Sequence, residues 1–153
     1  MMAELVIRKM EATDIDNVYE VEKASFETPW TKDIFYQELI ENQFANYFVM
    51  ELDNQLIGYA GLWVVIDDAQ ITNIAVMPIY RGKKLGEKLF LYTMQQAIRL
   101  GANHLSLEVR TSNIVAQRMY RKFGLVPGGI RKNYYTDNQE DAIVMWVNLY
   151  EKR

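Results

Sequence analysis

A strand-like run that passes through a basic, glycine-containing turn into a helical pattern is the feature that most constrains this fold. The run contains the β-branched residues Ile71, Ile74 and Val76 and stops at Pro78. The turn at residues 80–86 reads YRGKKLG, and a long helical pattern follows it directly. The first turn of a helix has free backbone N–H groups and the positive end of the helix dipole. A strand, such a turn and a helix in this order can therefore form an anion pocket.

The turn itself has two interpretations. Gly82 and Gly86 allow close approach of the backbone to a ligand, and Arg81, Lys83 and Lys84 add positive charge. These residues suit a phosphate group. A solvated basic loop that merely precedes a helix explains the same residues, so this segment alone does not establish a binding site.

Composition limits the classes of protein that remain. The chain has 153 residues, and we expect residues 1–153 to form a single domain. The absence of cysteine excludes a thiol nucleophile and a zinc–thiolate site, and a lone histidine, His104, excludes a multi-histidine metal site, so we expect no metal. A net charge of −3 gives no broad footprint for nucleic acid. With no signal peptide and no apolar membrane span, we expect a cytoplasmic monomer or weak dimer.

The hydrophobic periodicity predicts elements in the order βααβββαβαββ. We expect strands over residues 5–9, 47–52, 55–66, 70–76, 105–109, from 126 onward and 141–149, and helices over 13–26, 31–41, 84–100 and 112–123. Thr13 or Asp14, Thr31, and Ser112 or Asn113 are the expected helix caps. Asp53-Asn54 predicts a hairpin turn. This order implies an α/β fold in which a mixed sheet carries helices on both faces.

Few side chains remain that could perform chemistry. Glu108 lies near the end of a strand, where ligands gather in open α/β sheets. Spacing alone, however, favours a solvated glutamate on the polar face beside Ser106 and Arg110. Tyr120 lies on an apolar helical stripe, where a tyrosine is more often a core aromatic whose hydroxyl reaches an edge. Asn113 is first of all a helix cap.

Taken together, these segments resemble the GNAT acetyltransferase superfamily over essentially the whole chain. Residues 73–76 and 80–86 are similar to its acetyl-CoA-binding motif, usually written Q/R-x-x-G-x-G/A. Residues 107–110 and 112–124 are similar to its second half. The resemblance implies a GNAT-like fold with a central, mixed and strongly twisted sheet of about seven strands, flanked by four helices.

Narrower similarities point to one bacterial branch of the superfamily. They are found in residues 26–30, 107–110, 133–135 and 140–142. The branch implies an acyltransferase that moves the acetyl group of acetyl-CoA to a protein N-terminal α-amine, typically alanine on a small-subunit ribosomal protein. Two alternatives stay open: a GNAT enzyme for a lysine side chain or a small-molecule amine, and a non-catalytic acyl-CoA-binding module.

The resemblance also implies roles for individual residues. Glu108 would accept a proton, Tyr120 would donate one, and the backbone N–H of Val76 would stabilise an oxyanion if the strand splays there. Acetyl-CoA would contact a strand edge, a pyrophosphate loop and one residue near the thioester: Ile74, Ala75 and Val76; Arg81, Gly82, Lys83, Lys84, Leu85, Gly86 and Glu87; and Asn113. The acceptor would be bordered by Phe26, Trp30, Tyr134 and Tyr135.

One residue departs from the superfamily's motif. Lys84 stands where the motif usually has glycine. A left-handed backbone there would strain a lysine, whereas a right-handed helical backbone would keep the N–H and add the attraction of the ammonium group. Because Gly86 and the helical pattern after it are intact, we expect a right-handed helical backbone at Lys84.

Overall fold

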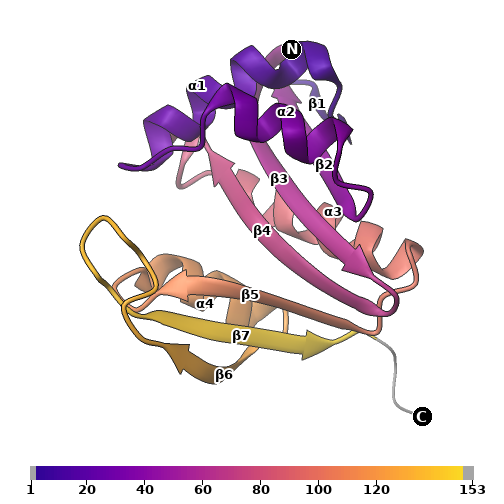
Figure 1. The fold of residues 1–153 in the computed structure, drawn as a ribbon. Helices are drawn as coiled ribbons and strands as arrows, with labels where there is room; N and C mark the ends of the chain where they lie inside the picture. Colours follow the sequence, from indigo (N-terminus) through magenta and orange to yellow (C-terminus); the bar gives the residue numbers. More distant parts are fainter. Residues whose placement is uncertain (1–2, 150–153) are drawn as a thin grey trace.

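The computed structural model describes residues 3–149, and its strands form one seven-stranded sheet in the order β1-β2-β3-β4-β5-β7-β6 (Figure 1). The strands are β1 (Leu5–Lys9), β2 (Ala45–Leu52), β3 (Gln55–Val65), β4 (Asp68–Val76), β5 (His104–Arg110), β6 (Val126–Arg131) and β7 (Ala142–Asn148). The helices are α1 (Ile15–Ser25), α2 (Lys32–Ile40), α3 (Leu85–Arg99) and α4 (Ile114–Lys122), with short 3-10 turns η1 (Ala12–Asp14) and η2 (Pro78–Tyr80). The predicted order of elements and the mixed sheet are confirmed.

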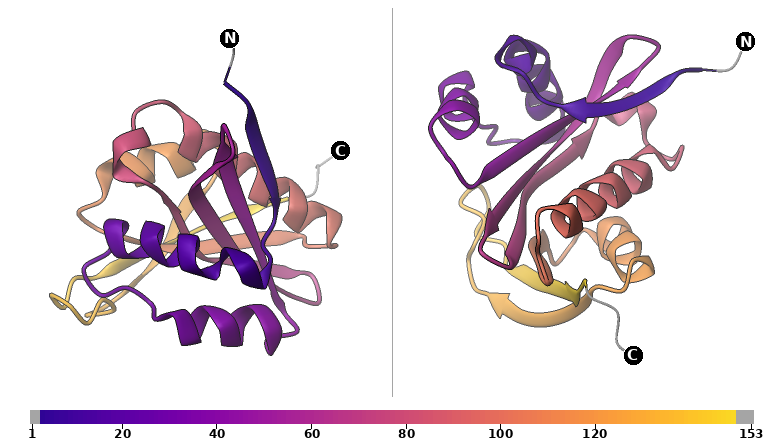
Figure 2. Two further views of the ribbon diagram at one scale, coloured as in Figure 1. Left: turned by 90° about the horizontal axis from the view of Figure 1, so that it is seen from above. Right: turned by 90° about the vertical axis from the view of Figure 1, so that its right-hand side faces the viewer.

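The helices cover both faces of the sheet, as predicted. Figure 2 shows α1 and α2 on one face and α3 and α4 on the other. Val18 and Phe35 pack with Tyr59 in the core beneath α1 and α2, and Phe90 and Leu107 lie in the core beneath α3 and α4. Within residues 3–149, no helix combines the length and the apolar character needed to cross a bilayer.

Local sequence signals explain most of the turns and helix starts. Asp53 and Asn54 have φ values of 50° and 68°, the left-handed pair that a two-residue hairpin turn requires. The side chain of Thr31 accepts a hydrogen bond from the backbone of Ile34 at 3.2 Å. Asn113 caps α4 in the same way. These predicted turns and caps are confirmed.

Asp14, one of the two residues predicted to cap α1, is the N-cap residue of that helix. Asp14 precedes α1 but makes no side-chain bond to that helix. Its carboxylate accepts the backbone N–H of Glu11 at 2.8 Å and the guanidinium of Arg8 at 2.8 and 2.9 Å. A charged partner on β1 therefore directs Asp14 away from the helix, which begins after η1.

The feature that creates the site is the separation of β4 from β5. These two strands form the sheet's parallel pair, and their ladder consists of only three residue pairs, from Asp68↔His104 to Gln70↔Ser106. Beyond Gln70 the strands diverge, as Figure 1 shows. The second half of β4 consequently has an open edge that faces the gap.

Candidate active site

The largest cavity that we describe has a volume of about 560 Å³ and lies where β4 and β5 diverge. It brings together residues of all three predicted sets, catalytic, cofactor-binding and acceptor-binding: Glu108, Tyr120, Ile74, Asn113, Phe26, Trp30, Tyr134 and Tyr135. These residues are far apart in the sequence. Their convergence is the main reason to regard the gap as an active site.

Glu108 faces this cavity and is held by two neighbours. Its side chain is only 10% exposed. Gln70 Nε2 donates to both carboxylate oxygens at 3.3 and 3.1 Å, and Arg131 Nε lies 3.3 Å from Oε1. The expectation of a solvated glutamate is therefore wrong, because strand separation turns the polar face of β5 into a cavity wall.

Tyr120 is both a core aromatic and a cavity residue. Its ring packs against Phe90 with centroids 5.1 Å apart, and the residue is 6% exposed. Burial raises the pKa of its hydroxyl, and the nearby Tyr135 adds to the effect. The hydroxyl therefore keeps its proton at neutral pH.

Three residues at the end of β4 were predicted to contact acetyl-CoA: Ile74, Ala75 and Val76. The open edge of β4 presents the backbone groups of two of them. The N–H of Met77 donates to the carbonyl of Ile57 at 2.7 Å. Along an antiparallel ladder, every second residue directs its backbone groups toward the partner strand, so residues two apart from Met77 share its direction. Ala75, opposite Tyr59, therefore directs its backbone groups toward β3. Ile74 and Val76 direct theirs into the gap, so the strand is splayed at Val76, which is the condition that its oxyanion role requires.

The loop before α3 differs from the expectation at one residue. Lys84 has φ 62° and ψ 17°, a left-handed conformation, and α3 begins at Leu85. The predicted right-handed backbone at Lys84 is wrong. Gly82 also has a positive φ, 82°, so the chain needs two left-handed residues to turn from η2 into the helix. Arg81 is exposed, and Gly86 lies in the first turn of α3.

Charges around this loop come partly from another helix. Lys122 on α4 contacts Glu87 with Nζ 2.9 Å from Oε1. This pair offsets the negative charge that Glu87 brings to the first turn of α3. Lys83 lies over the ring of Tyr80 at 5.8 Å. Leu85 is buried, which leaves only its backbone available to a ligand.

Arg110 organises the cavity wall opposite α1 and α2, although sequence reasoning did not single it out as a site residue. Its guanidinium lies 4.0 Å from the ring centre of Tyr135. It also donates to Asp137 at 2.7 Å and to Glu140 at 3.2 Å. Tyr134 packs edge-on against Tyr135 at 5.1 Å. One cation thus holds the aromatic loop between β6 and β7 in place.

Glu22 is a second cavity residue that sequence reasoning missed. It is 3% exposed and accepts hydrogen bonds from the backbone N–H of Trp30 and the hydroxyl of Tyr59. Burial raises the pKa of its carboxyl. The sequence could have indicated Glu22 through its position, because this charged residue shares one helical stripe with the apolar residues Ile15 and Val18.

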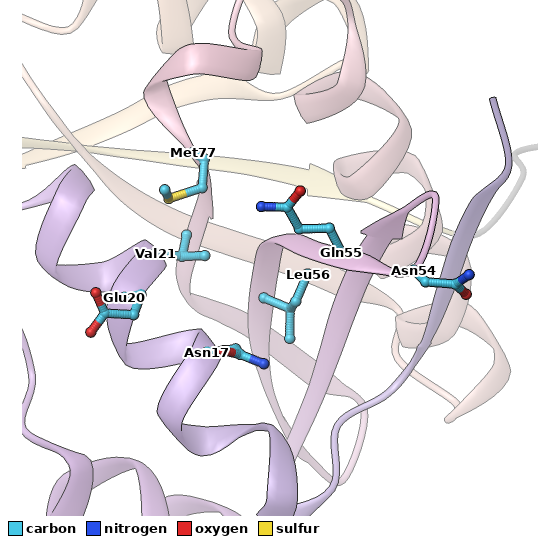
Figure 3. Close-up of a pocket in the computed structure, with 7 residues that line it drawn as sticks. All are labelled: Asn17, Glu20, Val21, Asn54, Gln55, Leu56 and Met77. Atoms are coloured by element: carbon cyan, nitrogen blue, oxygen red, sulfur yellow. The ribbon is translucent and has the colours of Figure 1, made fainter.

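A smaller hollow of about 340 Å³ lies on the α1 side of the sheet (Figure 3). Residues of α1, of the β2–β3 turn and the start of β3, and the residue that follows β4 line it: Asn17, Glu20, Val21, Asn54, Gln55, Leu56 and Met77. None of the predicted site residues lines it. The chemistry-bearing side chains lie instead in the larger cavity.

Comparison with known proteins agrees with this arrangement. The Acetyltransferase (GNAT) family matches residues 15–125. A relative from Bacillus subtilis (strain 168), named "Putative ribosomal protein bS18-alanine N-acetyltransferase", is 57% identical over 99% of this chain and 100% of its own length. The ribosomal protein bS18-alanine N-acetyltransferase of Escherichia coli (strain K12) is 35% identical over 91% of this chain and 94% of its own.

A solved structure supports the same relationship. The crystal structure of the ribosomal-protein-S18-alanine N-acetyltransferase from Escherichia coli superposes with a TM-score of 0.89 and 31% identity. The match covers 98% of this chain and 97% of the other. The fold agreement therefore extends across both halves of the sheet.

Proposed function

This chain belongs to the acetyltransferase (GNAT) family, and from that premise we propose that it acetylates the N-terminal alanine of ribosomal protein bS18. The observation that carries the proposal is the 57% identity, over nearly the whole chain, to a relative named for this reaction. We extend the proposal to a single catalytic domain over residues 1–153 that acts in the cytoplasm, where ribosomal proteins are made.

Acetyl-CoA supplies the acetyl group as a thioester, and four features of the structure fit it. The outward N–H and carbonyl of Ile74 and the outward carbonyl of Val76 suit the amides of its pantetheine arm. The first turn of α3 offers free N–H groups to the pyrophosphate. Lys83 and Lys84 add positive charge beside that turn. Asn113, at the cavity wall, would lie near the thioester.

Glu108 is the proposed proton acceptor. An α-amine has an ordinary pKa of about 7.7–8.0, so only a mild base is needed at neutral pH. Glu108 lines the cavity with its carboxylate fixed by Gln70. The amine would lose its proton to Glu108, directly or through water, as nitrogen bonds to the thioester carbon.

Tyr120 and Val76 are proposed to stabilise the charges that develop on oxygen and sulfur. The outward N–H of Val76 can donate to the developing oxyanion. As the C–S bond breaks, Tyr120 donates a hydrogen bond or its proton to the sulfur. A thiol has a pKa of about 8.5, below that of the Tyr120 hydroxyl, so hydrogen bonding carries most of this help. Direct transfer needs no enzyme nucleophile.

The acceptor peptide is proposed to lie between two aromatic walls. Phe26 and Trp30 form one wall, and Tyr134 and Tyr135 form the other. These walls also admit a lysine side chain or a small amine, so the acceptor needs a direct test.

The test is an acetyl-CoA assay on short peptides, read by mass spectrometry. A peptide with the bS18 N-terminal sequence should gain one acetyl group on its α-amine. The same peptide with a blocked N-terminus, and a lysine-bearing control with a blocked N-terminus, should gain none. Acetylation of the lysine control alone would reject the proposed acceptor. Acetyl-CoA should also raise the melting temperature, because a ligand at 100 times its Kd adds about 2.7 kcal/mol.

A further inference from the structure

The loop at residues 26–30, which we call the acceptor loop, is tied to the rest of the protein at few points. It joins α1 to α2 and contributes Phe26 and Trp30 to the cavity. Pro29 has no backbone N–H. Within the described residues 3–149, the hydrogen bond that residues 27–30 donate from their backbone is the one from Trp30 to Glu22. Phe26, at the start of the loop, donates its N–H to the backbone carbonyl of Glu22 at 3.0 Å, a bond that does not involve the Glu22 side chain. The position of the Trp30 end of the loop therefore depends on the Glu22 carboxylate.

Glu22 makes this bond from a buried position. Its Oε2 accepts the Trp30 N–H at 2.9 Å, while its Oε1 accepts the hydroxyl of Tyr59. In the described part of the chain, no lysine or arginine forms an ion pair with it. Burying a carboxylate without a cation is costly. An apolar side chain would fill this helical position at lower cost, so the carboxylate has another use.

The acceptor loop is also held by packing of the Trp30 ring. Phe35 on α2 lies between the two partners of Glu22: its ring centre is 5.4 Å from that of Trp30 and 5.5 Å from that of Tyr59. The backbone of Trp30 is thus held by Glu22 and its ring by Phe35. Both contacts draw the loop toward the sheet beside the cavity.

We propose that Glu22 is a positioning residue for the acceptor peptide, which acts by fixing the acceptor loop through the Trp30 amide. The inference rests on the proposed function, because the loop is expected to contact the acceptor and not acetyl-CoA. Loss of the tether should therefore weaken acceptor binding selectively.

Two substitutions at Glu22 separate hydrogen bonding from charge. Glu22→Leu removes both acceptors. Glu22→Gln keeps both bonds: its amide oxygen accepts the Trp30 N–H, and its amide nitrogen can donate to the hydroxyl oxygen of Tyr59. We expect Glu22→Leu to raise KM for the peptide about tenfold, the equivalent of one lost hydrogen bond to a charged group, and to leave KM for acetyl-CoA within about twofold. Glu22→Gln should restore the peptide KM.

Glu38 provides a matched control. It lies on α2 on the same face of the sheet, and its Oε1 accepts hydrogen bonds from Tyr47 at 3.0 Å and Trp63 at 2.7 Å. It does not line the cavity. Glu38→Leu likewise removes a carboxylate that accepts two side-chain hydrogen bonds, and it should leave KM for the peptide unchanged.

The Trp30 amide gives a direct readout of the tether. Its hydrogen–deuterium exchange should accelerate at least tenfold in Glu22→Leu and stay slow in Glu22→Gln and Glu38→Leu. If Glu22→Leu does not fold, Glu22→Met, which is also apolar and more flexible, replaces it in every measurement. An unchanged peptide KM or unchanged exchange in the apolar variant would overturn the proposal.

Two further outcomes would also overturn it. An equal KM rise in Glu38→Leu would mean that general loosening is the cause. A Glu22→Gln variant as impaired as Glu22→Leu would mean that the charge itself is required. Failure of the proposed function is seen separately, because it appears as an inactive wild-type enzyme on the alanine peptide. The variants are then compared on whichever amine the wild type acetylates.

Discussion

Gln70 and Glu108 are joined at the point where the two halves of the sheet separate. The side-chain amide of Gln70 on β4 donates to both carboxylate oxygens of Glu108 on β5, at 3.3 and 3.1 Å. Gln70 also belongs to the last residue pair of the β4–β5 ladder. The residue at the end of the strand pairing therefore also orients the proposed base. Its neutral amide holds the carboxylate without adding charge.

Replacing this amide by an acid should shift the pH dependence of the reaction. In Gln70→Glu, two carboxylates at hydrogen-bond distance would share a proton, so the pair stays protonated to a higher pH. We expect the acid limb of the kcat/KM profile to move up by about one pH unit. Gln70→Leu, the control, removes the hydrogen bonds without adding charge and should lower kcat/KM while moving the limb less than Gln70→Glu does. Superimposable profiles for the two variants would contradict this assignment.

Removing the proposed base should leave the reaction dependent on amine that is already neutral. In Glu108→Gln, kcat/KM at pH 7 should fall by about 10²-fold or more, the ordinary contribution of a general base. The rate should then rise with pH toward the amine's own pKa, about 7.7–8.0. The measurement is a pH–rate profile with the alanine peptide. A profile of wild-type shape would place the base elsewhere, with Tyr134 the first candidate.

The elements could be predicted from the sequence because their signals are local. The helix caps Thr31 and Asn113 and the turn Asp53-Asn54 depend on neighbours within a few residues, and the structure has all three. Asp14 stands at the N-cap of α1, as predicted, but its carboxylate bonds to Arg8 on a strand and to the backbone of Glu11 and not to the helix N-terminus. Local rules fail where a distant side chain offers a stronger bond.

The site was predicted only in part, for a related reason. Resemblance supplied Glu108 and Tyr120, and the structure brings them to one cavity. Spacing could not show that the strand edges diverge, so it suggested that Glu108 is solvated. Glu22 and Arg110 were missed because their partners are far from them in the sequence. For Glu22 the signal was a charged residue on a helical stripe that apolar side chains should fill, whereas Arg110 lies on the polar face of its strand and gave no such signal.

The left-handed Lys84 should be a source of strain that glycine relieves. A left-handed backbone costs a residue with a Cβ about 1–2 kcal/mol, and glycine avoids this cost. The greater entropy of the unfolded chain offsets part of that gain in a glycine variant. Lys84→Gly should therefore be more stable than Lys84→Ala by about 0.5–1 kcal/mol, measured by urea unfolding. Both variants lose the ammonium group, so both should bind acetyl-CoA more weakly. Lower stability of the glycine variant would rule out strain.

Glu140 should make folding sensitive to acid. Its carboxylate accepts hydrogen bonds from the Ser112 backbone at 2.7 Å and the Thr111 hydroxyl at 3.1 Å. These bonds, with help from Arg110, lower the pKa of Glu140 from 4.5 to about 2. A folded-state pKa below the unfolded value adds stability above pH 4.5, which is lost as the pH falls toward about 2.

The corresponding experiment compares stability at two pH values. Glu140→Gln should lower the free energy of unfolding at pH 7 and flatten its decline between pH 4.5 and 2. Glu27→Gln, at an exposed glutamate, serves as the control and should change neither value. A Glu140→Gln variant that loses stability in acid as steeply as the wild type would contradict the assignment.

Removal of the Tyr120 hydroxyl should slow the reaction without loosening the fold. Tyr120→Phe keeps the ring that packs 5.1 Å from Phe90. Acetyl-CoA should therefore raise its melting temperature as much as it does in the wild type, while kcat falls by about 10²–10³ because no donor faces the departing sulfur. Tyr92→Phe is the matched control, since its ring packs 5.4 Å from Phe48 and does not line the cavity. Wild-type turnover in Tyr120→Phe would make Tyr120 a core aromatic and nothing more, and would leave the backbone N–H of Val76 as the remaining donor at the thioester.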